Sequence, residues 1–268
     1  MRINSQFKIL GSTVLITALM SVSGQVVAEN PGGWEYSVAP LYLWAKNIEG
    51  DSGIGPVTAP LVLDFQDDIL ENLDAAFAIH FEAKQGDLTL FAEYNFARLD
   101  PGGEQTMGPI TAKLDVEFED TMWELGVAYA VFATQSTEWE VLGGVRYMEQ
   151  DVDIDIDITT EGPGEGPGII PSNITGGDDW WHGFGGVRVI TKISERWSFR
   201  ARADMGYKNS SNQSVQGIGM FDYRFRDWGS VFMGYRYLGI DYEGGSGSDR
   251  YAFDGDQQGP LLGFNFYF

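Results

Sequence analysis

The chain has 268 residues, with 17 Lys and Arg against 39 Asp and Glu, and it contains no Cys. A formal net charge of −22 argues against nucleic acid as a partner, and the lack of Cys excludes a disulfide framework. An aromatic content of 14% together with 35 Gly is typical of a membrane β-barrel, where rings form interfacial girdles and glycine fits crowded walls and turns.

A secretory signal peptide is predicted at the N-terminus. Arg2 and Lys8 precede an apolar run that is too short for a transmembrane anchor, and a small-residue cleavage site ends at Ala28. The signal therefore covers 1–28, and the mature part, 29–268, is predicted to be one barrel domain. Removal of the signal leaves 15 Lys and Arg against 39 Asp and Glu, because it contains two basic residues and no acidic one.

Along the mature chain, apolar and polar residues alternate with period two, which predicts an all-β fold. In 196–208, for example, Trp197 and Phe199 share one face while Arg200 and Arg202 share the other. One soluble sandwich core would have to absorb every such aromatic face, whereas a lipid belt accepts them all. The predicted fold is a closed antiparallel transmembrane β-barrel with long extracellular loops.

About ten strands are predicted in chain order. They run near 34–46, 74–86, 87–105, 110–133, 138–158, 180–194, 196–208, 213–226, 228–243 and 258–268. Short turns alternate with longer connections, as periplasmic turns and extracellular loops do, and an even count returns both termini to the periplasm. Two loops are long: 47–73 and the Gly/Pro-rich 159–179.

Two other strand counts remain open. A twelve-strand alternative makes 57–65 a spanning strand and splits 110–133 at Asp120, but the turn would have no Gly, Asn or Pro. An eight-strand barrel is the smaller alternative. In the loop 47–73, the spacing of Ile69, Leu70 and Leu73 predicts a short amphipathic helix that either folds into the barrel mouth or caps it from outside.

The last predicted strand alternates to a C-terminal aromatic residue. Leu262, Phe264, Phe266 and Phe268 share one face, as in the terminal strands by which outer-membrane barrels are delivered to the insertion machinery. The barrel-assembly machinery is therefore an expected partner through Phe268, as are outer-membrane lipid and lipopolysaccharide.

Several stretches resemble a largely uncharacterised family of proteobacterial outer-membrane β-barrel proteins, in the broad OmpA/opacity-type barrel superfamily. They include Ala39-Pro40-Leu41-Tyr42-Leu43-Trp44, Asp68-Ile69-Leu70-Glu71-Asn72-Leu73-Asp74, Gly143-Gly144-Val145-Arg146-Tyr147, Gly234-Tyr235-Arg236-Tyr237 and Gly259-Pro260-Leu261-Leu262-Gly263. This resemblance implies a porin-like barrel in the Gram-negative cell envelope. It names no substrate.

The inward faces carry segregated charge. An acidic side is predicted from Glu35, Glu82, Glu93, Glu124 and Glu140, with Lys84 and Arg146 among them. The basic side comprises Arg188, Lys192, Arg200, Arg202, Lys208, Arg224, Arg226 and Arg236, with Asp204 and Asp222 among them. These charges either pair across a plugged lumen or create a transverse field in an open channel that orients small polar solutes. Phe91, Met148 and Phe184 also point inward and narrow the interior.

A second acidic group is expected at the outer rim. It consists of Asp115, Glu117 and Glu119 in one strand and Asp151, Asp153, Asp155 and Asp157 in the next. Opposed like charges destabilise a sheet, so Ca²⁺ or Mg²⁺ bound directly or bridging to lipopolysaccharide phosphates would offset them. The alternative is a solvated pair of strands without a metal; no other cofactor is expected.

Enzymatic activity is not expected. The only histidines, His80 and His182, are predicted to point inward, and no serine motif accompanies either one. The leading hypothesis is a narrow passive channel for small polar solutes, or an envelope structural barrel if the lumen is plugged. The alternative is adhesion or ligand binding through the extracellular loops.

Overall fold

The computed structural model describes residues 33–40, 42–100, 102–107, 110–160 and 173–268. The predicted signal peptide, 1–28, and most of the Gly/Pro-rich loop lie outside these residues. No helix among them is long and apolar enough to cross a membrane.

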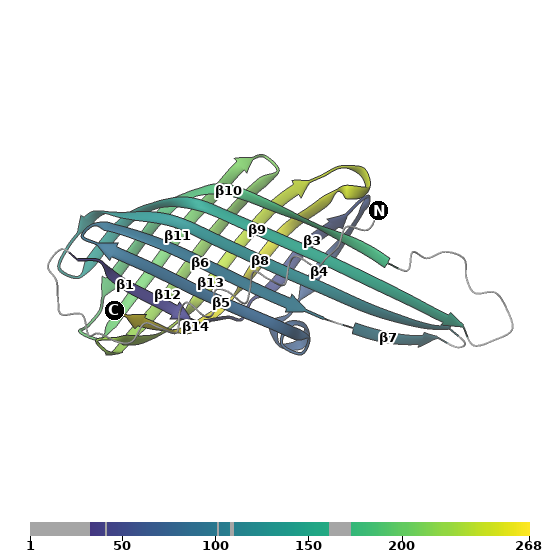
Figure 1. Ribbon diagram of the computed structural model, residues 1–268, viewed down its shortest axis with the longest axis horizontal. Coiled ribbons are helices and arrows are strands. Elements are labelled where there is room, and N and C mark those ends of the chain that lie inside the picture. Colours follow the sequence, from purple (N-terminus) through teal and green to yellow (C-terminus); the bar gives the residue numbers. More distant parts are fainter. Residues whose placement is uncertain (1–32, 41, 101, 108–109, 161–172) are drawn as a thin grey trace.

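Ten strands form a closed antiparallel barrel (Figure 1), as predicted. They are β1 (Glu35–Pro40), β5 (Leu73–Gln85), β6 (Leu88–Leu99), β8 (Ile110–Ala133), β9 (Thr137–Thr160), β10 (Asn173–Lys192), β11 (Trp197–Asn209), β12 (Asn212–Arg226), β13 (Gly229–Gly244) and β14 (Tyr251–Tyr267). The barrel closes where Ser37 of β1 pairs with Tyr267 of β14. β8 runs unbroken through Asp120, so the split required by the twelve-strand alternative is wrong.

The predicted loop 47–73 contains a β-hairpin. Its second strand corresponds to the strand 57–65 of the twelve-strand alternative but lies outside the ten strands that close the barrel, and its first strand was not expected. After the short β2 (Leu43–Trp44), β3 (Asn47–Ile54) pairs with β14, and β4 (Val57–Leu63) pairs only with β3. The predicted helix is reduced to the five-residue helical turn η2 (Phe65–Ile69). Ile69 is 5% exposed and belongs to the apolar cluster inside the mouth.

One end of the barrel carries a long extension that we call the arm. It consists of β7 (Gly102–Met107) and the parts of β8, β9 and β10 formed by 110–119, 151–160 and 173–177. β8 and β9 have 24 residues each, whereas about 9–11 residues suffice to cross a bilayer. Figure 1 shows them projecting beyond the other strands. We call this the arm end, and the opposite end, which has short turns, the turn end.

The polarity of the inward and outward faces reverses along β8. In the barrel, the outward residues Trp123 and Leu125 are 43% and 54% exposed, and the inward Glu124 is fully buried. In the arm, the outward Glu117 is exposed and the inward Phe118 is 5% exposed. A lipid belt requires apolar side chains outside, and water requires the opposite. The membrane boundary on β8 therefore lies near Thr121.

Candidate functional site

The lumen is the candidate site because the inward faces of seven strands bring charged side chains together there. β5, β6, β8 and β9 supply four buried carboxylates, at Glu82, Glu93, Glu124 and Glu140. β10, β11 and β13 supply three buried guanidinium groups, at Arg188, Arg202 and Arg236. The acidic and basic sides inferred from period two thus face each other across the lumen.

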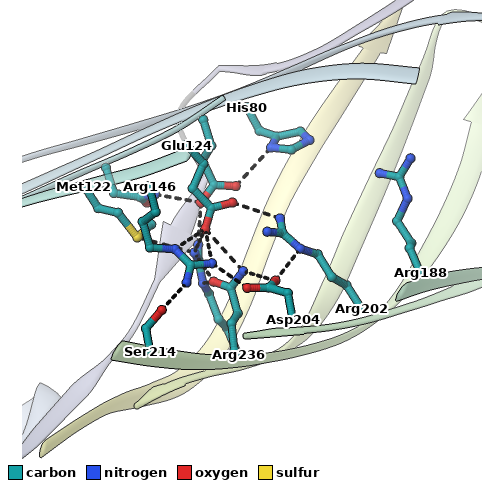
Figure 2. A network of polar contacts seen from close by, with 12 residues as sticks. His80, Met122, Glu124, Arg146, Arg188, Arg202, Asp204, Ser214 and Arg236 are labelled. Atoms are coloured by element: carbon teal, nitrogen blue, oxygen red, sulfur yellow. Dashed lines mark hydrogen bonds and ion pairs between the residues drawn. The ribbon is translucent and has the colours of Figure 1, made fainter. Parts of the chain in front are cut away.

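Glu124 lies at the centre of the first group of ion pairs, which we call the central cluster (Figure 2). Its Oε1 accepts a hydrogen bond from Arg146 Nε at 2.8 Å, and its Oε2 accepts one from Arg202 Nη1 at 2.9 Å. Arg146 also pairs with Asp204 at 2.8 Å, and Arg236 pairs with Glu93. Three carboxylates and three guanidinium groups therefore give the central cluster no net charge.

A second group lies nearer the turn end. Arg188 pairs with both Glu82 and Glu140, and Arg200 Nη1 is 3.0 Å from Glu82 Oε1. Two carboxylates again meet two guanidinium groups. His80 connects the two groups, because its ring nitrogens lie 3.0 Å from Glu93 Oε2 and 3.3 Å from Glu82 Oε1.

A polar layer that the sequence did not indicate lies on the arm side of the central cluster. Lys46 pairs with Asp120 and donates a hydrogen bond to Gln257 at 3.0 Å. Asp120 Oδ1 also accepts hydrogen bonds from Gln150 at 2.9 Å and from Gln257 at 3.1 Å. Asp120 and Gln150 could have been predicted to face the lumen, because they alternate with outward residues, but no sequence pattern places Lys46 opposite them.

Apolar side chains close the lumen at the arm end. Trp180 stacks on Tyr242 with ring centroids 4.0 Å apart. Twelve buried residues form this plug: Ile48, Ile69, Leu99, Phe118, Met122, Met148, Trp180, Leu238, Ile240, Tyr242, Tyr251 and Phe253. Phe91 and Phe184 pack together between the central cluster and the second group of ion pairs. Side chains therefore cross the interior in successive layers, and a cavity of about 60 Å³ remains beside Phe91, Glu82 and Arg200.

The remaining predicted lumen residues lie outside this network. Glu35, Lys192, Arg224 and Arg226 are exposed near the turn end. Lys208 was predicted to face the lumen, but the register shifts between Tyr207 and Asn209, and Lys208 is exposed with its Nζ 4.7 Å from the Trp181 ring. A β-bulge redirects the side chain, so strict alternation misplaces Lys208.

The lumen also contains a Ser-His-Asn hydrogen-bond chain that no sequence motif indicates. Ser214 Oγ is 2.8 Å from His182 Nε2, and His182 Nδ1 is 2.9 Å from Asn212 Oδ1. This is the order of nucleophile, base and orienting group used in acyl transfer. However, the three residues are 6%, 0% and 3% exposed, and Arg146 also donates to Ser214 Oγ. A Cβ at Gly206 would lie 2.3 Å from His182, so even the room for the imidazole depends on this glycine.

At the rim, β8 and β9 pair as expected from the acidic pattern. Asp115 lies opposite Asp155, Glu117 opposite Asp153, and Glu119 opposite Asp151, while Asp157 lies opposite Lys113. Arg98 on β6 partly offsets the like charge, because it forms ion pairs with Glu119 at 2.5 Å and with Glu117 at 3.5 Å. Among the described side chains, no group of three or more His, Cys, Asp or Glu is placed to hold a metal ion; those of Asp115 and Asp157 are not described.

No protein-family model and no curated protein matches the sequence. Among solved structures, the chain is similar to the outer-membrane protease OmpT from Escherichia coli, with a TM-score of 0.53, 7% identity and coverage of 91% of this chain and 99% of that one. Weaker similarities, at TM-scores of 0.36 and 0.34, are to the outer-membrane protein AlkL (13% identity, 92% and 94% covered) and to Ail of Yersinia pestis (9% identity, 89% and 100% covered). At these identities the similarity shows the fold alone, which is that of an outer-membrane β-barrel.

Proposed function

We propose that the protein is a non-conducting outer-membrane barrel that anchors the arm outside the bilayer as part of the envelope structure. The observation that carries this proposal is the layer of buried ion pairs that crosses the lumen. Arg146 and Glu124 are fully buried at its centre, and Glu124 also pairs at 3.5 Å with Arg236 of β13, on the opposite wall. An ion passing through would have to break pairs whose members would remain desolvated, which is strongly unfavourable.

The arm provides such a barrel with an exposed surface for binding partners. Its outward face carries the exposed Glu117, Asp153 and Asp155. A folded barrel with a closed interior supplies a rigid base for this face, and the face would attract cationic partners. The alternative considered from the sequence, adhesion or ligand binding through the extracellular loops, would in this barrel use the arm.

Planar-bilayer recordings of the refolded protein test the proposal. We expect no stable conductance steps at neutral pH, because the ion pairs and the apolar plug leave no aqueous path. A heat-dependent shift in gel mobility, measured on the same sample, verifies that the silent protein is folded. Reproducible open steps from the folded protein would contradict a closed lumen and favour the channel hypothesis.

A further inference from the structure

The barrel wall is interrupted on one side, between 42–46 and 73–78; we call this interruption the seam. β1 pairs with β5 only as far as Pro40 and Ile79. Beyond Pro40, which has no N–H group to donate, the chain follows β14 instead, with Leu43 opposite Leu262. Among the residues that the structure describes, no backbone hydrogen bond joins the two sides of the seam.

A cavity of about 280 Å³ occupies the seam. It is lined by Leu43, Phe77 and Phe96 from the outward face and by Tyr42, Trp44, Lys46, Ala76, Ala78, Asn95 and Ala97. Leu43 and Phe77 are 50% and 38% exposed, whereas Tyr42 and Lys46 are buried. The cavity therefore extends from the lipid-facing side of the wall toward the lumen.

The outer opening of the cavity lies beside the aromatic girdle. The Phe77 ring is 6.0 Å from that of Tyr94, and Tyr94 is 4.3 Å from Trp123. Rings of this kind mark the level of the lipid head groups in outer-membrane barrels. An amphiphile dissolved in the leaflet on the arm side would meet the seam with its polar head at the same level.

The inner wall of the cavity is suited to a hydrogen-bond acceptor. Trp44 Nε1 is buried and has no hydrogen-bond partner, which is unfavourable unless a ligand or water supplies one. Two cationic groups flank its ring: Lys46 Nζ at 5.1 Å and Arg236 Cζ at 4.5 Å from the centroid. Both cations are already paired, Lys46 with Asp120 and Arg236 with Glu93, so the N–H of Trp44 is the donor left for an oxygen with a strong dipole.

We propose that the seam binds one hydrocarbon chain with a carboxyl or ester head group. The head accepts the hydrogen bond of Trp44 Nε1, and the chain lies between Leu43 and Phe77. The cavity is near the lower limit of about 300 Å³ for sites that hold small organic ligands, so one short or medium chain fits better than a diacyl lipid as a whole. The source is either a free fatty acid or one acyl chain of a neighbouring lipid.

Fluorescence quenching in reconstituted bilayers tests this site, because bromine quenches indole emission on contact. The emission of Trp44 is obtained by subtracting the spectrum of Trp44→Phe from that of the wild type. One arm adds 2-bromodecanoic acid, whose bromine is next to the carboxyl group, to bilayers of unbrominated lipid. The other arm uses phospholipid whose acyl chains are brominated next to the ester, with no added acid. Ala76→Phe fills the cavity, and Ala92→Phe is the matched control, because Ala92 lies on β6 but outside the cavity lining.

We expect saturable loss of the Trp44 emission in the wild type and in Ala92→Phe, and no such loss in Ala76→Phe. Loss with the free acid alone identifies a fatty acid as the ligand, and loss in brominated lipid without added acid identifies a lipid chain. If neither probe quenches Trp44, or if Ala76→Phe is quenched like the wild type, the cavity holds only water and the proposal is overturned. The gel-mobility shift verifies folding for every variant.

Discussion

Individual charged residues in the lumen act as core residues. Arg236 is 1% exposed, pairs with Glu93 and donates hydrogen bonds to Gln216. A buried ion pair contributes little net stability compared with an apolar pair, but removal of one partner leaves the other charge desolvated and unpaired. For stability, the charge balance within the central cluster is therefore more important than the number of its ion pairs.

We predict that Arg236→Met lowers the free energy of unfolding by about 3–5 kcal/mol, because it leaves the central cluster with an unpaired carboxylate. Urea unfolding of the refolded barrel in detergent measures the change. Adding Glu93→Gln should recover part of the loss, and Arg226→Met, at an exposed arginine that alternation also assigned to the lumen, should change stability little. Equal losses in both arginine variants would mean that lumen charges are not core residues.

The alternation of side chains with period two also explains which lumen residues could be predicted from the sequence. Glu82, Glu93, Glu124, Glu140, Arg188, Arg202 and Arg236 lie in regular strand segments, where alternation fixes the face. Lys208 lies at a bulge, where it does not. The pairing partners themselves, such as Asn212 with His182, depend on the register between strands, and sequence alternation carries no register.

At the scale of elements, the bounds of a strand were predicted most accurately where the whole strand lay in one environment or where that environment changed sharply. The bounds of β8, 110–133, were predicted to the residue. β10 and β14 begin seven residues earlier than the predicted 180 and 258, because their first residues lie beyond the lipid belt, where the outward face is no longer apolar. The β3–β4 hairpin was missed because it pairs with β14 outside the regular order of the barrel.

Cation binding by the rim stays a prediction, and it belongs to the paired strands β8 and β9. Their outward faces place Glu117 opposite Asp153 and Glu119 opposite Asp151, with Arg98 as a partial counter-charge. Ca²⁺ is expected to raise the melting temperature of the folded protein more than NaCl at equal ionic strength, since screening alone does not depend on ion type.

The double variant Glu117→Gln with Asp153→Asn is the control for this experiment. It removes one opposed pair of carboxylates, so it should be more stable than the wild type without metal and respond less to Ca²⁺. Repeating the melting experiment with Mg²⁺ in place of Ca²⁺ shows whether the stabilisation depends on how the carboxylate oxygens are arranged around the ion. A melting temperature that is the same in CaCl₂ and NaCl would leave the rim as a solvated, salt-screened pair of strands.

At the scale of the whole molecule, one continuous sheet lies in two solvents: lipid surrounds the barrel, and water surrounds the arm. Within the bilayer the interior is polar and the exterior apolar; at the base of the arm the exterior is acidic and Phe118 and Val152 pack inside. They join the same apolar cluster as Trp180 and Tyr242, so the base of the arm continues the packed core of the barrel.

The orientation of the arm across the outer membrane is a prediction that the absence of native Cys makes easy to test. Short turns usually face the periplasm and long extensions face outward, so the arm should be extracellular and the turn end periplasmic. Single-cysteine variants Glu117→Cys in the arm and Ser136→Cys in a short turn are both at exposed positions. A membrane-impermeant maleimide should label the first on intact cells and the second only after the outer membrane is permeabilised. The reverse labelling would place the arm and its acidic face in the periplasm, where lipopolysaccharide phosphates of the outer leaflet could not be bridged by cations bound there.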